Sequence, residues 1–84
     1  MLDHFEFMHA VGCAAEVAEN AESKYGEYAS PHEVLGVICE EWNELQDAMH
    51  KSDYKHARQE AIDIAAVCLR FASETTRRER AGQC

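Results

Sequence analysis

The sequence predicts an all-α fold built from three antiparallel helices at about residues 2–24, 31–50 and 54–76. Apolar residues recur three and four positions apart in all three segments, as in amphipathic helices. Short polar or glycine-containing links separate the segments, and no stretch shows the strict alternation of a half-buried strand. The 84 residues are expected to form a single domain, 1–84, without internal repeats.

Local signals mark the ends of these helices. Gly26 is the expected left-handed residue that ends the first helix. Ser30, followed by a proline, is the expected N-cap of the second helix, and Glu33 completes a capping box. Ser52 or Asp53 can cap the third helix. The last residues are polar, so we expect the final turns to fray.

The composition restricts the classes of partner. Sixteen acidic residues face eight basic ones, which gives a formal net charge of −8. This excess of acids argues against nucleic acid, because phosphate contacts need clustered Lys and Arg, and it argues equally against anionic membranes. No apolar run approaches the length of a membrane span. No basic segment followed by an apolar run opens the chain, so we expect a cytoplasmic protein.

The four cysteines form no C-x-x-C pair, which fits reduced thiols in the cytosol. Three of them lie among apolar helical residues and are expected to be small buried hydrophobes: Cys13, Cys39 and Cys68. Trp42 also lies on an apolar arc, which favours core packing over stacking on a base.

The third predicted helix is apolar on almost all sides, and only two other helices exist to cover it. A chain of this length gains little stability from its own core. We therefore expect a homo-oligomer in which a second subunit completes a four-helix-type bundle.

Acidic residues recur at helical spacing in the second segment. With Val34 at zero and about 100° per residue, Glu41 falls at about 340°, inside the apolar arc. Glu44 falls at about 280°, at the edge of that arc, and Glu40 at about 240°, on the polar side. The three acids are therefore not equivalent: Glu41 is expected to point inward and Glu40 to lie outside.

The third segment repeats the pattern with Glu60 and Asp63. Counted from Tyr54, Glu60 falls at about 240°, among apolar side chains, and Asp63 at about 180°, at the border of the apolar surface. Helices joined by a short link pack antiparallel, so these two acids can meet Glu41 and Glu44.

Converging carboxylates repel one another and need neutralisation. They can stay protonated, pair with Arg58 or Arg70, or bind a hard divalent cation. Magnesium suits an all-oxygen ligand set, manganese can replace it, and no Cys/His spacing suits structural zinc. A di-iron centre needs Glu-x-x-His pairs on facing helices. The available acid-x-x-His pairs, two of which fall on polar or linking positions, are Glu6/His9, Asp47/His50 and Asp53/His56.

The arrangement E-E-x-x-E, fifteen residues, then E-x-x-D resembles the signature of MazG-like all-α nucleoside triphosphate pyrophosphohydrolases, including small phage-type members. The resemblance implies magnesium-dependent hydrolysis of NTPs or dNTPs between the α and β phosphates, by dimers or dimers of dimers. The metal ligands that it implies are Glu41, Glu44, Glu60 and Asp63. Glu40 and Glu41 would act in catalysis, with Glu40 beside the ligands or positioning the attacking water.

The nearest bases that could contact substrate phosphates are Lys51, Lys55 and Arg58. The alternative to an enzyme is a MazG-like helical module that serves in oligomerisation or interaction without turnover. Both readings predict the same helical bundle, and only the first predicts release of pyrophosphate.

Overall fold

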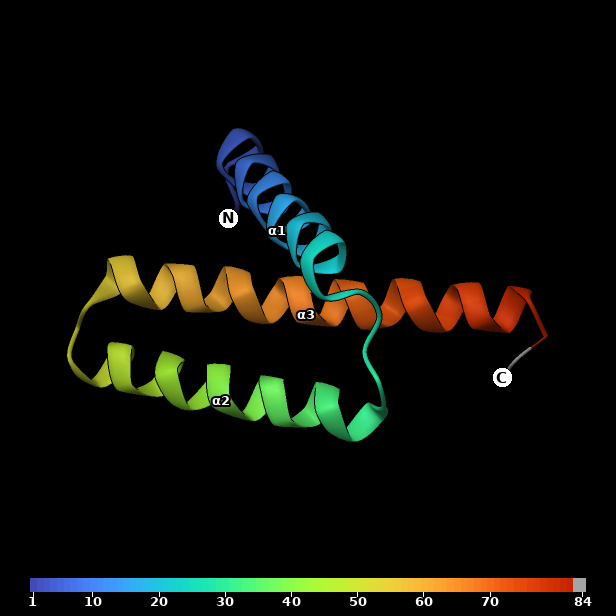
Figure 1. Cartoon of the computed structure of the whole chain (residues 1–84). Coiled ribbons are helices and arrows are strands. Elements are labelled where there is room, and N and C mark those ends of the chain that lie inside the picture. Colours follow the sequence, from blue (N-terminus) through green and yellow to red (C-terminus); the bar gives the residue numbers. More distant parts are fainter. Residues whose placement is uncertain (83–84) are drawn as a thin grey trace.

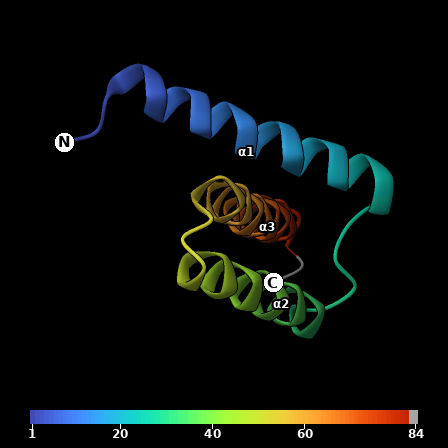
Figure 2. The same cartoon turned by 90° about the vertical axis from the view of Figure 1, so that its left-hand side faces the viewer.

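The computed structural model describes residues 1–82 and contains three helices, α1 (His4–Tyr25), α2 (Pro31–His50) and α3 (Tyr54–Arg80). No strand occurs among these residues. α2 and α3 lie antiparallel and side by side, whereas α1 crosses α3 and makes no contact with α2 (Figures 1 and 2). The all-α prediction with three helices is confirmed. The antiparallel alignment holds for α2 and α3, while α1 crosses its neighbour.

The helix ends follow the local chemistry of the chain. Gly26 ends α1 with a positive φ of 73°. The Ser30 hydroxyl accepts a hydrogen bond from the Glu33 N–H at 3.2 Å, and the Glu33 carboxylate accepts one from the Ala29 N–H at 2.8 Å. Asp53 provides the N-cap of α3. Each link is thus shaped by side chains that accept the N–H groups left free at a helix start.

α3 continues to Arg80, beyond the expected end at about residue 76. The helix thus includes residues where fraying was expected, and the last two residues, 83–84, lie outside the described part of the chain. The reason for the longer helix is a set of contacts with the link between α1 and α2, because both Arg77 and Arg78 form ion pairs with Glu27. Basic side chains in a last helical turn also interact favourably with the helix dipole.

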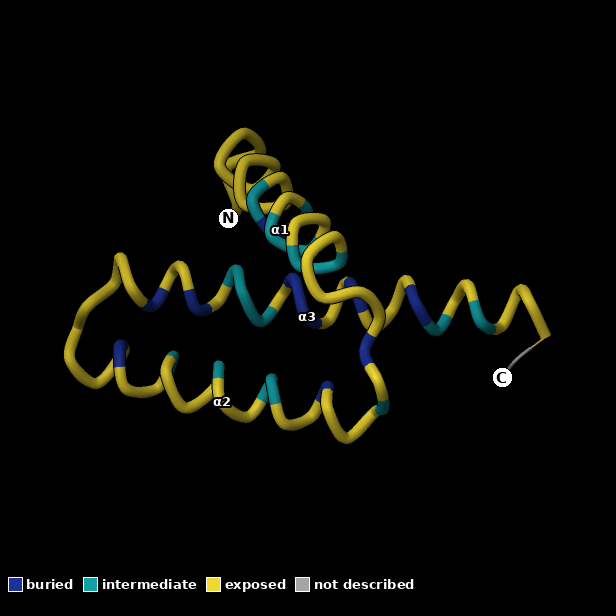
Figure 3. The backbone as a smooth tube through the Cα atoms, in the orientation of Figure 1, coloured by how far each residue is buried: buried dark blue, intermediate teal, exposed yellow. Residues whose placement is uncertain are grey.

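The core of this single chain is small. Tyr28, Val34 and Val67 form its buried apolar cluster, and Val37 and Ile38 pack against it half-buried. Buried positions occur along α2 and α3 and in the link before α2, whereas the start of α1 is exposed (Figure 3). Buried alanines bring the helices together at other points, at Ala14, Ala48, Ala57 and Ala66.

Several apolar residues that the sequence predicted to be buried are exposed. Trp42 is 52% exposed, so the expected core packing is wrong in this chain. Cys39 and Cys68 are exposed and Cys13 is half-buried, which also contradicts the expected burial; Cys84 lies outside the described residues. For Trp42 and Cys39 the physical reason is that α2 has only α3 as a neighbour, so one flank of its apolar arc stays uncovered.

The molecule is extended for its mass. Its accessible surface is 6435 Å², whereas a folded monomer of 9.5 kDa is expected to expose about 5000 Å². Its radius of gyration is 14.2 Å, against about 12 Å for a compact chain of this length. No helix in residues 1–82 is apolar over enough of its length to cross a membrane.

Candidate metal centre

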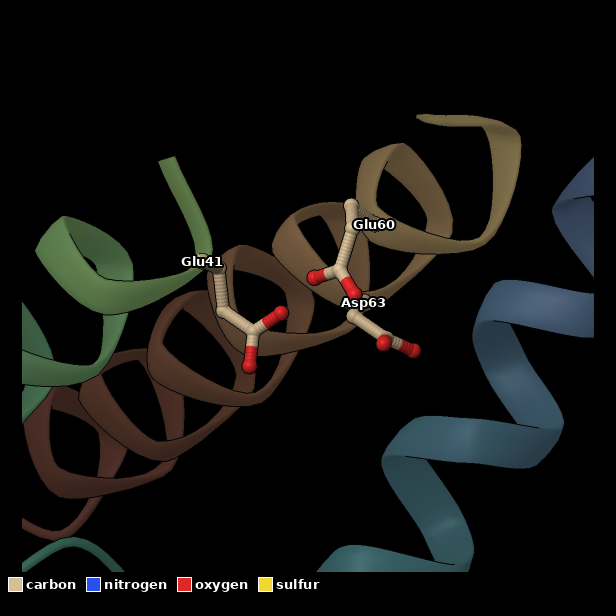
Figure 4. Close-up of side chains that lie close together, drawn as sticks. All are labelled: Glu41, Glu60 and Asp63. Carbon is tan, nitrogen blue, oxygen red and sulfur yellow. The ribbon is translucent and has the colours of Figure 1, made fainter. Parts of the chain in front are cut away.

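Carboxylates from α2 and α3 converge at one place between the two helices. Glu41 comes from α2, and Glu60 and Asp63 come from successive turns of α3 (Figure 4). One oxygen from each carboxylate lies within 4.8 Å of the others. The spacing of three residues places Glu60 and Asp63 on one face of α3, and the antiparallel packing brings Glu41 opposite them.

This cluster is partly withdrawn from water. Glu60 is 6% exposed, and Glu41 and Asp63 are half-buried. The Oε2 atoms of Glu41 and Glu60 are both buried, and neither has a hydrogen-bond partner in the described part of the chain. A buried carboxylate oxygen without a donor is costly, so the pair requires either a shared proton or a cation.

Without a cation, a shared proton resolves the repulsion. The hydrogen bond between Glu41 and Glu60, followed by burial and the nearby negative charges, raises the pKa of Glu41 from 4.5 to about 8. The same hydrogen bond lowers the pKa of Glu60, because its ionised form accepts the proton that Glu41 holds. A hydrogen bond with Glu60 also raises the pKa of Glu44. Glu60 therefore favours the ionised form, and its hydrogen bond with Glu41 favours the protonated form of Glu41.

Two polar side chains of α3 support the cluster from the helix turn before each acid. The Nε2 atom of His56 lies 3.2 Å from Oε1 of Glu60. The Gln59 amide donates a hydrogen bond to Oδ1 of Asp63 at 3.0 Å. His56 was expected at a polar or linking position and was not predicted to contact the cluster. The spacing of four residues between His56 and Glu60 is the signal that could have identified it.

The remaining predicted ligands and catalytic residues lie around this cluster. Glu44 is exposed and reaches Glu60 from the next turn of α2, but it is outside the group of three oxygens. Glu40 is exposed, as its helical phase predicts. The structure therefore brings together Glu41, Glu60 and Asp63, with Glu44 at the edge and Glu40 outside.

The predicted phosphate contacts are all exposed and are not joined to the cluster. Lys51 forms an ion pair with Asp47 at 2.8 Å. Within residues 1–82, no hydrogen bond or ion pair links Lys51, Lys55 or Arg58 to the acids of the cluster. Arg70 also does not neutralise it, since its guanidinium group contacts Tyr28 and the end of α1. Pairing with Arg58 or Arg70 is therefore not how these carboxylates are balanced.

The donor set suits a hard divalent cation. In an octahedral site with bonds of about 2.1 Å, ligand oxygens on opposite sides are separated by about 4.2 Å. Oxygens spread over 4.8 Å would therefore need to approach by a few tenths of an ångström. Among the described residues this is the only group of three or more acidic, His or Cys side chains at such distances, and all its ligand atoms are oxygens. This set favours Mg²⁺ or Mn²⁺ over zinc.

No protein-family model, no curated protein and no solved structure matches this chain. A metal centre is thus indicated by the residues themselves: three converging carboxylates, two buried oxygens without a donor, and the spacing of the acids along two helices.

Proposed function

We propose that this chain is a Mg²⁺-dependent nucleoside triphosphate pyrophosphohydrolase of the MazG-like kind, with Mn²⁺ able to replace Mg²⁺. Its substrates would be NTPs or dNTPs, and its products a nucleoside monophosphate and pyrophosphate. The observation that carries the proposal is the convergence of Glu41, Glu60 and Asp63, whose oxygens lie within 4.8 Å of one another. The resemblance of the acidic motifs to that family supplies the reaction.

The buried oxygens explain why a cation rather than solvent would complete this site. Oε2 of Glu41 and Oε2 of Glu60 have no hydrogen-bond partner. A Mg²⁺ ion that replaced the proton held between the two carboxyl groups would satisfy both oxygens. Mg²⁺ usually keeps several waters and is completed by substrate phosphates. Glu44 is exposed at the edge of the cluster, and such ligands would approach from that side.

The acidic and polar side chains of the cluster would have different roles in the reaction. Glu41, Glu44, Glu60 and Asp63 would hold the cation, and His56 and Gln59 would orient Glu60 and Asp63. Bound Mg²⁺ would polarise the phosphate and lower the pKa of a coordinated water. Glu40 would position the attacking water or accept its proton. Water would attack the α-phosphorus, the bond to the bridging oxygen would break, and pyrophosphate would leave.

The proposed enzyme works as a homodimer or a dimer of dimers in the cytoplasm, and association would complete a four-helix-type bundle. The accessible surface exceeds that expected of a monomer by about 1400 Å², which is more than the roughly 800 Å² each partner buries in a standard interface. Large apolar side chains remain exposed on all three helices, including Phe5, Trp42 and Leu69. This surface supports association of copies of the chain. Three free cysteines agree with a reducing compartment.

The test is direct product analysis. The protein is incubated with each NTP and dNTP and Mg²⁺, and nucleotides, pyrophosphate and orthophosphate are separated and quantified. We expect monophosphate and pyrophosphate in equal amounts from at least one substrate. Asp63→Asn should lower the rate by at least about tenfold, because loss of a group that only orients a metal ligand already costs about 10–100-fold. Glu79→Gln, which removes an exposed charge from the end of α3, should keep the rate. Absence of pyrophosphate from every nucleotide would refute the enzymatic proposal.

A second candidate function is an oligomerisation or interaction module with no turnover. The uncovered apolar surface favours it, because that surface alone would suffice for assembly. It predicts an oligomer that releases no pyrophosphate and whose thermal unfolding does not respond to Mg²⁺. Pyrophosphate release that Asp63→Asn abolishes would exclude this purely structural role.

A further inference from the structure

A second polar cluster lies where the end of α1 and the following link meet α3, away from the metal centre. Arg70 of α3 donates hydrogen bonds to the Tyr28 hydroxyl at 3.0 Å and to the Gly26 carbonyl at 2.9 Å. The Glu74 carboxyl group accepts one from the Tyr28 N–H at 3.2 Å through Oε1. Glu22 of α1 lies 3.8 Å from the Arg70 guanidinium group. The cluster thus ties both α1 and the link at residues 26–30 to α3.

The burial of the acids creates an imbalance within this cluster. Glu74 is 3% exposed and Arg70 is 9% exposed. Oε2 of Glu74 and Oε2 of Glu22 are both buried, and neither has a hydrogen-bond partner among the described residues. Two carboxylates beside one guanidinium group leave one negative charge uncompensated in a buried place. A proton shared between the two carboxyl groups removes that charge and satisfies both oxygens.

The charges that face the pair define how it would respond to pH. Burial, followed by the hydrogen bond with Glu22, raises the pKa of Glu74. Glu19 of α1 and Arg77 of α3 line the same open cavity of about 350 Å³, but Arg77 is already paired with Glu27. Arg70 is the remaining positive group in contact with the pair, and its hydrogen bonds go to Tyr28 and Gly26.

We propose that the Glu22–Glu74 carboxyl pair is a proton-dependent contact that holds α1 and the 26–30 link on α3. With the proton present, Glu74 donates to Glu22 and accepts from the Tyr28 N–H. When the proton leaves to solvent, the buried carboxylate of Glu74 and the partly exposed carboxylate of Glu22 face one Arg70, and the link and the end of α1 separate from α3. The pair therefore makes the position of α1 depend on pH above the ordinary range of carboxyl groups.

The test measures hydrogen exchange of the Tyr28 amide, whose N–H contacts Glu74, from pH 6 to pH 9 with a chelator present. Protection is corrected for the intrinsic pH dependence of exchange. In the wild-type protein we expect protection to fall by up to about tenfold per pH unit, the limit for loss of one proton. In Glu74→Gln the amide can donate to Glu22 at every pH, so protection should stay level. Glu79→Gln removes an exposed charge from the same helix and should behave as wild type.

Glu22→Gln provides a second variant, because this side chain is partly exposed and its amide can donate to ionised Glu74. Its Tyr28 protection should also stay level with pH. Both variants keep Glu41, so a response that persists in them would come from the metal centre or from global unfolding. An undiminished pH response in Glu74→Gln and Glu22→Gln, or a level response in the wild-type protein, would overturn the proposal. If Glu74→Gln does not fold, Glu22→Gln decides alone.

Discussion

Replacing Glu41 by Gln should stabilise the metal-free protein while removing its metal site. Glu41 keeps a proton in the folded state because it donates to buried Glu60. A Gln side chain has nearly the same shape, and its amide can make the same donation at every pH. The variant therefore separates the stability of the fold from the demands of the metal site.

The magnitude follows from the two pKa values of Glu41. The folded pKa of about 8 exceeds the ordinary value of 4.5, so the unfolded chain loses its proton first as pH rises. Wild-type stability therefore falls between about pH 4.5 and pH 8, by about 1.4 kcal/mol per unit at most. At pH 7 the upper limit is about 3 kcal/mol. Partial exposure of Glu41 and the opposite pKa shift of Glu60 reduce the expected gain to about 1–2 kcal/mol.

Urea or thermal unfolding measures this difference at pH 5 and pH 7 in the presence of a chelator. We expect Glu41→Gln to unfold several degrees above wild type at pH 7, since about 1 kcal/mol shifts the midpoint of such a small domain by about 4–8 °C. At pH 5 the gain should fall below about 1 kcal/mol. Glu40→Gln, an exposed neighbour, should change stability by less than about 0.5 kcal/mol at either pH. A less stable Glu41→Gln at pH 7, or a gain that does not change with pH, would refute the shared proton.

Two further predictions concern the fold and its assembly. Gly26→Ala should destabilise the protein by about 1–3 kcal/mol in unfolding experiments, because φ 73° with ψ −163° is a conformation that only glycine adopts readily. Gly36 lies within α2, and no atom lies close to a Cβ added there, so Gly36→Ala should stabilise the protein by about 0.5–1 kcal/mol. Equal effects of the two substitutions on stability would contradict this expectation. Light scattering should show a dimer or larger species for the wild type, and Leu69→Glu should shift it toward monomer by charging the uncovered face of α3. A monomeric wild type at micromolar concentration would contradict the interpretation of that surface.

The helix boundaries could be predicted because their signals are local. Gly26, Ser30 and Asp53 act within one or two turns of their own position, and the structure places each at a helix end. The end of α3 could not be predicted in this way. It depends on ion pairs between Arg77, Arg78 and Glu27, which lie about fifty residues apart in the chain.

The inward positions of the acids were also predictable from helical phase. Glu41 is half-buried whereas Glu44 and Glu40 are exposed, so Glu41 is the most buried of the three acids of α2, as predicted. Glu60, which was expected among apolar side chains, is buried. The phase calculation could not show how Glu44 turns toward Glu60, because that depends on side-chain conformation and on the distance between helices.

Burial of apolar residues was the least predictable property. Periodicity identifies which face of a helix is apolar, but it does not identify what covers that face. Trp42 lies on the predicted arc and yet remains half exposed, since α1 crosses α3 and makes no contact with α2. The same crossing brings Glu22 close to Arg70 and Glu74, a contact for which the sequence gives no periodic signal.

Direct measurement of cation binding tests the central claim, that Glu41, Glu60 and Asp63 form a site for a divalent metal. Titration calorimetry with Mg²⁺ at pH 7, repeated with Mn²⁺ and electron paramagnetic resonance, gives the number of sites per chain. We predict one class of site that both cations share, its loss in Asp63→Asn, and its retention in Glu79→Gln. Absence of binding to the wild-type protein, or equal binding by wild type and Asp63→Asn, would contradict it.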